Sequence, residues 1–397
     1  MTIRVLFLDH AGELGGAELS LLDLVTKLPI TAHVVLLSEG PFKERLKNAG
    51  ASVEVVTAGS SIHNIRRRSG VRALLRSMPA VLSLVRQVSN RAGDYDLIYA
   101  NSQKALVIAA LAGILSRRPV VWHLRDILTS EHFSGVTRKA VVTLANYCAR
   151  KVITNSAATA RAFVDAGGSK NKTTIIYNSI DPKVFDEIDA ISVRKIRDSI
   201  VPAEVFLVGV FGRLAPWKGQ HVLIESLTDL PDIHVAVVGS SLFGEEKYER
   251  ELKDQVAKLG LQDRVHFLGF QSEIPSFMRA MDIIVHTSIS PEPFGRVIVE
   301  GMLAERPVIA AKAGGVLEIL DDGKSGLLVS PGDPKKLAKA IKVLGENAVL
   351  AKRIAVEGKK VALARFSPPK MLNRVHNVLV AVSSGISIDD VSSNDDQ

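Results

Sequence analysis

The sequence predicts an α/β protein built from two doubly wound, Rossmann-like parallel-sheet domains that face a cleft. Short β-branched runs alternate with helical patterns along most of its 397 residues, as is typical of parallel sheets covered by helices on both faces. The runs form two series, separated by the turn signal Asn178-Ser-Ile-Asp-Pro182. Because 47% of the residues are hydrophobic, a chain of this length can bury two cores.

The expected strands are short apolar runs bounded by polar segments. In the first series they are Val5–Leu8, Val34–Leu37, Val53–Val56, Leu97–Ala100, Val120–Trp122 and Val152–Thr154, and in the second Val205–Phe211, Val235–Val238, Val265–Leu268, Ile283–Val285 and Pro307–Ala310. A helical segment, Ile191–Asp198, follows the turn signal. We therefore expect a first domain over residues 1–190 and a second over residues 191–369. Since open α/β sheets bind ligands outside the carboxyl ends of their strands, a shared ligand is expected in the cleft.

Composition excludes several classes of protein. No apolar run approaches the about 20 residues that a membrane-spanning helix needs. The start, Met1-Thr-Ile-Arg-Val-Leu-Phe-Leu-Asp9, is typical of a strand and not of a signal peptide, so we expect a cytoplasmic protein. The single cysteine, Cys148, excludes an internal disulfide framework and a cysteine-rich metal site.

Three glycines follow the first expected strand. Gly12, Gly15 and Gly16 precede the expected helix Ala17–Lys27, and glycine there lets the backbone approach a phosphate or a sugar. Their spacing does not match a dinucleotide-binding fingerprint. An equally good interpretation is that these glycines only shape a tight turn.

The first strand of the second domain leads into a basic loop. Gly212 and Arg213 follow this strand directly, and Lys218 and Gly219 come shortly after. The planar guanidinium and the mobile ammonium together suit a diphosphate, although a solvated basic loop is the alternative. Small residues at further strand ends, Gly239, Gly269 beside Phe270, and Gly314 with Gly315, predict a floor for a flat ligand.

Two glutamates separated by seven residues, Glu292 and Glu300, follow the strand that ends near His286. Pro293, Phe294 and Gly295 predict a strand-to-helix turn, and residues 296–304 predict the helix. The first N–H groups of that helix favour an anion. One carboxylate can therefore meet the reacting sugar of a nucleotide-sugar, and the other a ribose diol. For Glu300 the alternative is a helix carboxylate paired with a neighbouring cation.

Taken together, these motifs resemble a retaining glycosyltransferase of the GT-B fold, family four (glycosyl transferases group one). The resemblance covers nearly the whole chain and is most specific in the second domain. It rests on Gly15-Gly16, Gly212-Arg213, Lys218-Gly219, the Glu292–Glu300 element, Pro307-Val-Ile, Gly314-Gly315 and Gly326-Leu-Leu-Val. It implies a nucleotide-sugar donor, no metal ion, and retention at the anomeric carbon. It also implies that a closing helix over residues 370–385 returns to the first domain. The Ser- and Asp-rich composition of the end of the chain predicts a mobile tail over residues 386–397.

The resemblance implies roles for individual residues. Arg213 and Lys218 would hold the diphosphate, Gly16 would approach the phosphate from across the cleft, and Glu300 would bind the ribose. Glu292, with the backbone of Phe294 and Gly295, would hold the donor sugar. The complete implied donor site is Gly15, Gly16, Gly212, Arg213, Lys218, Gly239, Phe270, Glu292, Phe294, Gly295, Arg296 and Glu300.

His123 matches the family's first-domain histidine, close to where sugar and acceptor would meet. It completes the expected catalytic set of Arg213, Lys218, Glu292 and His123. An equally good interpretation is a hydrogen-bonded core histidine. Asn101 and Arg125 lie in the loops from which an acceptor site would be assembled.

The expected chemistry follows from the charges. Breaking the anomeric C–O bond develops negative charge on the diphosphate, and Arg213 and Lys218 would stabilise it in place of a metal ion. In the family the leaving phosphate is thought to accept the acceptor's proton, so Glu292 would orient the sugar and not act as a nucleophile. Carboxylates on one loop and its helix also argue against a two-carboxylate glycosidase.

An arginine-rich segment lies between Ser61 and Gly93. It carries Arg66, Arg67, Arg68, Arg72, Arg76, Arg86 and Arg91, with no Asp or Glu and with apolar residues interspersed. Such a pattern predicts a cationic amphipathic helix or helix pair. The segment 66–91 either meets an anionic membrane surface or lipid-diphosphate acceptor, or packs on the sheet with a solvated arginine face. It lacks the features of a nucleic-acid reader.

The resemblance therefore implies a metal-independent retaining hexosyltransferase without a cofactor. Its donor would be a nucleotide-sugar, UDP-glucose by the frequency of donors in the family, and its acceptor a glycan or lipid-linked molecule in polysaccharide or glycolipid biosynthesis. The alternative is a sugar-nucleotide epimerase or a catalytically silent nucleotide-binding relative on the same scaffold. We expect a cytoplasmic protein that associates with the inner membrane face if the arginine-rich segment binds lipid.

Overall fold

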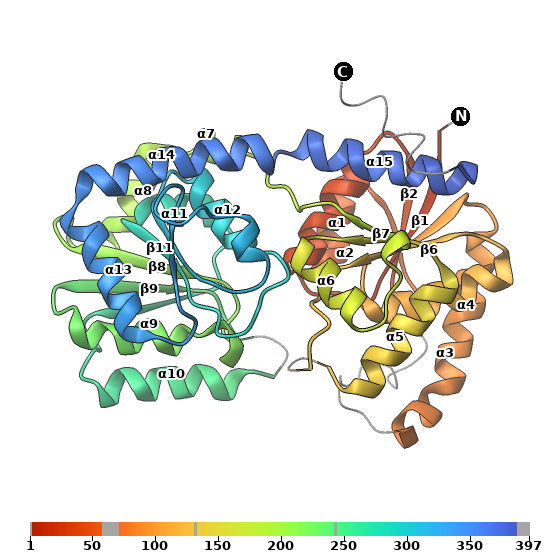
Figure 1. Ribbon diagram of the computed structural model, residues 1–397, viewed down its shortest axis with the longest axis horizontal. Coiled ribbons are helices and arrows are strands. Elements are labelled where there is room, and N and C mark those ends of the chain that lie inside the picture. The colour runs from red at the N-terminus through yellow and green to blue at the C-terminus, as the bar shows by residue number, and fades with distance from the viewer. Residues whose placement is uncertain (1, 58–70, 131–132, 242–243, 387–397) are drawn as a thin grey trace. The chain divides into compact units, whose positions relative to one another are not determined.

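The computed structural model describes residues 2–57, 71–130, 133–241 and 244–386, with only the backbone for residues 71–77. The chain divides into two compact units (Figure 1). The first unit is Met1–Asn178 with Pro369–Gln397, and the second is Ser179–Pro368. Each unit is a parallel sheet covered by helices on both faces, which confirms the predicted fold class.

The first unit contains a seven-stranded sheet in the order β3-β2-β1-β4-β5-β6-β7. Its strands are β1 (Arg4–Asp9), β2 (Thr31–Leu36), β3 (Ser52–Val55), β4 (Leu97–Ala100), β5 (Val120–Leu124), β6 (Ala149–Thr154) and β7 (Thr173–Ile175). Its helices are α1 (Gly16–Lys27), α2 (Pro41–Asn48), α3 (Val71–Ala92), α4 (Gln103–Ser116), α5 (Gly135–Cys148), α6 (Ala157–Asp165) and α15 (Pro368–Ser384), with a short 3-10 helix at Lys170–Lys172.

The side chains of β1 alternate between two buried layers because its two faces are both covered. Val5 and Phe7 pack in the layer that contains residues of α1, α2 and α15. Leu6 and Leu8 pack in the opposite layer, with residues of α3, α4 and α5. All four side chains are fully buried, so the sheet sits at the centre of the first unit.

The second unit contains a six-stranded sheet in the order β10-β9-β8-β11-β12-β13. Its strands are β8 (Phe206–Phe211), β9 (Ile233–Val238), β10 (Val265–Gly269), β11 (Ile283–His286), β12 (Val308–Ala311) and β13 (Leu327–Val329). Its helices are α7 (Lys183–Asp186), α8 (Ala190–Asp198), α9 (Gln220–Ser226), α10 (Glu246–Lys258), α11 (Ile274–Ala280), α12 (Arg296–Leu303), α13 (Pro334–Glu346) and α14 (Ala348–Arg365), with 3-10 helices at Pro216–Lys218, Leu227–Asp229 and Gly315–Glu318.

The boundary in the chain lies earlier than the predicted position near residue 190. Residues 179–190 belong to the second unit because their polar groups bond to it. The N–H of Ile180 donates to the carbonyl of Phe366 at 3.1 Å, and Arg296 donates to the carbonyl of Ser179 at 3.4 Å. Asp186 pairs with Lys359 at 3.5 Å.

The helix predicted in the arginine-rich segment is present as α3. Arg66, Arg67 and Arg68 lie outside the described residues. Leu84 and Val88 are buried in the core of the first unit, while Arg86 is exposed. Arg91 pairs with Glu54 of β3. The described part of α3 therefore packs on the sheet. No helix in the described residues is both long and apolar enough to cross a membrane, and the predicted tail falls almost entirely outside them.

Candidate functional site

The candidate residues lie at the topological switch point of each sheet, where the order of the strands reverses. In the first sheet β1 lies between β2 and β4, and in the second sheet β8 lies between β9 and β11. Loops at the carboxyl ends of such strand pairs leave the sheet in opposite directions, and ligands of doubly wound sheets bind there. The carboxyl ends concerned are Asp9 and Ala100 in the first unit, and Phe211 and His286 in the second.

In the second unit, two cationic side chains gather around Trp217 in the loop after β8. The Arg213 guanidinium lies 5.9 Å from the centre of the Trp217 rings, and the Lys218 ammonium 4.5 Å from it. Gly212 and Gly239 adopt positive φ angles of 126° and 137°. A Cβ on Gly239 would overlap the carbonyl of Gly212, so only glycine lets the β8 and β9 loops approach this closely.

Glu292 lies beside these cations and is almost completely buried, with 5% of its surface exposed. Its Oε1 forms an ion pair with the Lys218 ammonium and accepts a hydrogen bond from Ser288 Oγ at 2.7 Å. His286 Nε2 lies 3.2 Å from the same oxygen. Burial alone would raise the pKa of Glu292, but the charges and hydrogen bonds of Lys218 and His286 hold it well below its usual range. The carboxylate is therefore ionised at neutral pH.

The backbone around Glu292 is fixed by the loop that follows β12. The Gly315 N–H donates to the Glu292 carbonyl at 2.9 Å, and Gly314 forms a parallel bridge with Glu292. The ring of Phe294 is buried against Phe366, with centroids 5.5 Å apart, so only its backbone is available to a ligand. Gly295, with φ of 110°, is the N-cap residue of α12.

The second glutamate of the motif is paired within its own helix. Arg296 and Glu300 lie one turn apart on α12, and their side chains meet at 3.4 Å. This is the pairing that the alternative interpretation of Glu300 predicted. Both side chains keep about a sixth of their surface exposed, at 16% and 17%, so a ligand can still reach the carboxylate. Phe270, after β10, is 70% exposed.

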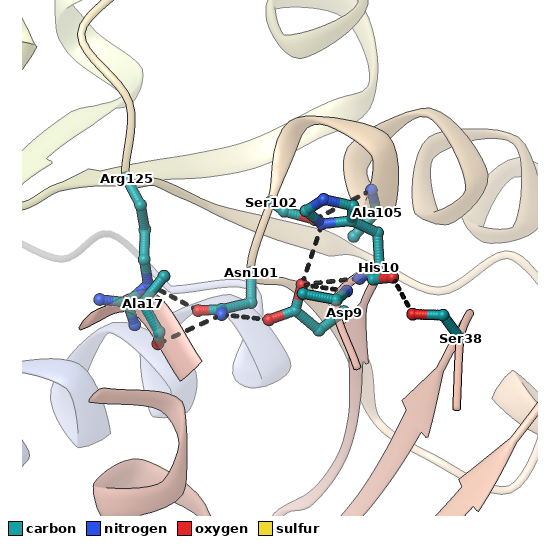
Figure 2. A network of polar contacts seen from close by, with 9 residues as sticks. Asp9, His10, Ala17, Ser38, Asn101, Ser102, Ala105 and Arg125 are labelled. Carbon is teal, nitrogen blue, oxygen red and sulfur yellow. Dashed lines mark hydrogen bonds and ion pairs between the residues drawn. The ribbon is translucent and has the colours of Figure 1, made fainter. Parts of the chain in front are cut away.

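In the first unit, a polar network joins the ends of β1, β4 and β5 (Figure 2). Asn101 donates to Asp9 at 2.5 Å and accepts from Arg125 Nε at 2.7 Å. Arg125 also donates to Asn178 Oδ1 at 3.0 Å. The Asp9 carboxylate is completely buried. Burial alone would raise its pKa, but hydrogen bonds from His10 and Asn101 and the charge of His10 keep that pKa lowered. The predicted acceptor residues Asn101 and Arg125 are therefore together.

Gly15 and Gly16 begin α1, and the carboxylate of Glu18 lies next to them. Glu18 is 8% exposed, and a Cβ on Gly15 would come within 2.7 Å of its Oε2. Burial, and then the negative charge of Asp9, raise the pKa of Glu18 to about 7. The carboxyl group of Glu18 thus lies at the N-terminus of α1, where the sequence predicted that a phosphate or a sugar approaches.

His123 lies on β5 with 1% of its surface exposed. Its Nδ1 is 2.5 Å from the hydroxyl of buried Tyr99. Burial, together with the nearby charge of Arg125, lowers the pKa of His123 well below its ordinary value, so the ring is neutral. This environment favours the alternative of a hydrogen-bonded core residue, and the sugar-side role stays a prediction.

Sequence reasoning missed the residues that support the predicted ones. His286, Ser288 and Trp217 surround Lys218 and Glu292, and Asp9 and Glu18 complete the first-unit network. Two of these residues could have been found from their position, because Asp9 and His286 are the last residues of their strands. No group of three or more metal-binding side chains occurs among the residues the structure describes.

Two family models match the chain, one in each half. "Glycosyltransferase Family 4" matches residues 14–184, and "Glycosyl transferases group 1" matches residues 193–361. Among curated proteins, the lipopolysaccharide core biosynthesis glycosyltransferase LpsE of Rhizobium meliloti (strain 1021) is 34% identical over 166 residues, which are 42% of this chain and 47% of LpsE. The chain spans about half the length of LpsE and of two further curated relatives.

Solved structures match over nearly the whole chain. HepE of Anabaena, in complex with UDP-glucose, has a TM-score of 0.88 and 41% identity, covering 96% of this chain and 100% of HepE. A glycosyltransferase from Rickettsia africae ESF-5 has a TM-score of 0.82 at 20% identity, over 96% of this chain and 98% of that protein, and shows likeness of fold alone. On the matches to both halves and to HepE, this chain belongs to the family-four glycosyltransferases, the glycosyl transferases group 1, with the GT-B fold.

Proposed function

We propose that this glycosyltransferase moves a hexose from UDP-glucose to a glycan or lipid-linked acceptor, with retention at the anomeric carbon and without a metal ion. The observation that carries this proposal is the grouping of Arg213, Lys218 and Glu292 where β8 and β11 end. Two cations and one ionised carboxylate are the charges needed at a diphosphate and at the hydroxyl groups of its sugar.

Each charge has a separate task. As the anomeric C–O bond breaks, its electron pair leaves with the diphosphate, and the positive charges of Arg213 and Lys218 stabilise that leaving group. The ammonium of Lys218 has three N–H donors, so its ion pair with Glu292 does not prevent contact with a phosphate. Glu292 accepts hydrogen bonds from sugar hydroxyls and orients the ring. The leaving phosphate receives the proton of the attacking hydroxyl.

The choice of donor is supported by a relative. HepE binds UDP-glucose in its crystal structure and is 41% identical over its whole length. In this chain Glu300 would receive the ribose hydroxyls, and exposed Phe270 offers an aromatic surface at the carboxyl end of β10. The backbone N–H groups at the start of α12 would face the donor's negative charge.

The acceptor is assigned to the first unit, where the buried network of Asp9, Asn101 and Arg125 fixes the loops at the ligand edge of the sheet. A polysaccharide or glycolipid pathway is supported by the lipopolysaccharide core enzyme LpsE, with 34% identity over 42% of this chain. Such acceptors are often held at membranes. Helix α3 exposes Met78 and Leu82, at 42% and 57%, near exposed Arg86, which supports peripheral binding to an anionic bilayer.

Binding and hydrolysis of a donor panel test this function. The purified protein is incubated with UDP-, GDP- and ADP-glucose in the presence of EDTA, and thermal stabilisation and nucleotide release are measured. We expect UDP-glucose alone to stabilise the protein and to be hydrolysed slowly. Lys218→Ala and Glu300→Ala should abolish hydrolysis, and NMR of products formed with an identified acceptor should show retained configuration. Stabilisation only with added divalent ions, or by no donor, would contradict the proposal.

Membrane association is tested separately by co-sedimentation with anionic vesicles at low and high salt. Wild-type protein should pellet at low salt and be released by high salt. Leu82→Asp should reduce pelleting without altering UDP-glucose hydrolysis. Wild-type protein that stays in the supernatant at low salt would refute the membrane assignment.

A further inference from the structure

The Glu292 carboxylate is held by two side chains, His286 and Ser288, that no sequence motif marked as functional. Both are buried, with 6% and 1% of their surface exposed. Ser288 Oγ donates to Glu292 Oε1 at 2.7 Å, and His286 Nε2 lies 3.2 Å from that oxygen and 3.2 Å from Ser288 Oγ. Ser288, His286 and the Lys218 ammonium therefore all contact Oε1.

The hydrogens of this cluster can be assigned from its neighbours. Oε1 is only an acceptor because Glu292 is ionised, so the Ser288 hydroxyl donates to it. The Ser288 oxygen is then available to accept from His286. Since Nε2 faces two accepting oxygens, Nε2 of His286 carries a hydrogen. Three donors from different residues thus hold one carboxylate oxygen, and Oε2 stands outside this set of contacts.

Backbone contacts fix where these donors lie. Thr287 Oγ1 donates to the Lys218 carbonyl at 2.7 Å, and the Ile289 N–H donates to the Trp217 carbonyl at 2.9 Å. Gly219 has a φ of 70°, and a Cβ there would overlap the Thr287 carbonyl. The loop after β11 is therefore attached to the loop after β8, which places Ser288 and Lys218 on the same oxygen.

We propose that His286 and Ser288 are positioning residues that aim Glu292 Oε2 at the hydroxyl groups of the donor sugar and so determine how much tighter the protein binds a nucleotide-sugar than the bare nucleotide. This inference rests on the proposed function. A glutamate's last torsion is broad, so an unrestrained carboxylate would spend much of its time in unproductive orientations. Anchoring Oε1 removes that freedom before the ligand arrives, which is preorganisation.

The inference makes a selective prediction. Glu292 contacts the sugar in the proposed function, while Arg213 and Lys218 contact the diphosphate that UDP and UDP-glucose share. Loss of a Glu292 anchor should therefore weaken UDP-glucose binding and leave UDP binding unchanged. A residue that merely supports the fold would affect both ligands alike.

The experiment measures the Kd of UDP and of UDP-glucose by calorimetry, using the full chain with EDTA. Ser288→Ala removes one oxygen atom, His286→Phe removes the Nε2 donor, and His286→Gln offers an amide N–H in its place. His234→Phe, the same change on β9, is the matched control. Thermal unfolding of each variant reports whether it is folded.

We expect Ser288→Ala and His286→Phe to weaken UDP-glucose binding by about tenfold, as for the loss of one hydrogen bond to a charged group. The Kd of UDP should stay within about twofold, His286→Gln should recover most of the loss, and His234→Phe should match wild type. Equal weakening of both ligands, or no change in their ratio in Ser288→Ala, would overturn the inference. A wild-type protein that binds neither ligand would overturn the proposed function, and this inference with it.

Discussion

The buried carboxyl group of Glu18 makes the stability of the first unit depend on pH. Its pKa is raised from 4.5 to about 7 by burial and by the negative charge of Asp9, and His10 and Arg125 oppose that rise. At about 1.4 kcal/mol per pH unit, this corresponds to about 3 kcal/mol of stability. Because the folded pKa is higher than the unfolded one, that stability is fully present below pH 4.5 and is lost as pH rises through 7.

Replacing Glu18 by Gln tests this account. Glutamine has a similar shape and no charge, so the Glu18→Gln protein should not lose this stability as the pH rises. The difference in unfolding free energy between Glu18→Gln and wild type should therefore grow by about 2.5 kcal/mol between pH 5 and pH 8, because part of the loss has already occurred at pH 5. Comparing variant with wild type at each pH cancels the other titrating groups, except those directly coupled to Glu18.

Tryptophan fluorescence can report the unfolding of the first unit separately from that of the second. The chain has two tryptophans, of which Trp122 is buried in the first unit and Trp217 lies in the second. In a Trp217→Phe background, urea unfolding followed at pH 5, 6, 7 and 8 reports the first unit alone. Glu13→Gln, at an exposed position just before α1, is the control and should show no trend. A Glu18→Gln difference that stays constant within about 0.5 kcal/mol would refute the reasoning.

Three further substitutions have effects that follow from single contacts. Gly239→Ala would force a side chain onto the Gly212 carbonyl at a φ of 137°, and should lower the urea stability of the second unit by about 2 kcal/mol and weaken UDP-glucose binding; unchanged stability would count against the close loop contact. Arg125→Leu should lower the stability of the first unit by about 3 kcal/mol, measured by Trp122 fluorescence, because it removes the buried donor to Asn101 Oδ1 and one of the two donors to Asn178 Oδ1; a loss below about 0.5 kcal/mol would contradict this. Lys218→Ala removes the main charge that holds the pKa of Glu292 low, so UDP-glucose binding should fall on acidification at a higher pH than in wild type, and identical binding profiles would exclude that coupling.

Most of the fold could be predicted from the sequence because each buried strand is a short apolar run. All eleven expected strands occur, within three residues of their predicted bounds. The edge strands β7 and β13 were not predicted, since each has three residues and gives too short a pattern. The boundary was misplaced because the bonds of Ser179 and Ile180 to Arg296 and Phe366 join residues far apart in sequence.

The position of the site could be predicted because ligands of parallel sheets bind at the carboxyl ends of the strands. Arg213, Lys218 and Glu292 lie in the loops that follow two buried strands and carry charges that an apolar core would not tolerate. The ion pair of Lys218 with Glu292 and the part of His286 depend on the register of β11 beside β8, which a single sequence does not contain. His123 shows the same limit, because a strand buried on both faces gives no sign of which way each side chain points.

The last helix has a consequence for how the protein is made. Met371, Val375 and Leu379 of α15 are buried with Phe7 and Leu21, near the start of the chain. During synthesis the ribosome therefore releases the first sheet long before the helix that seals one of its faces. The second unit, contained between residues 179 and 368, can complete its core earlier. The nascent first unit therefore keeps this apolar face uncovered until α15 has been synthesised.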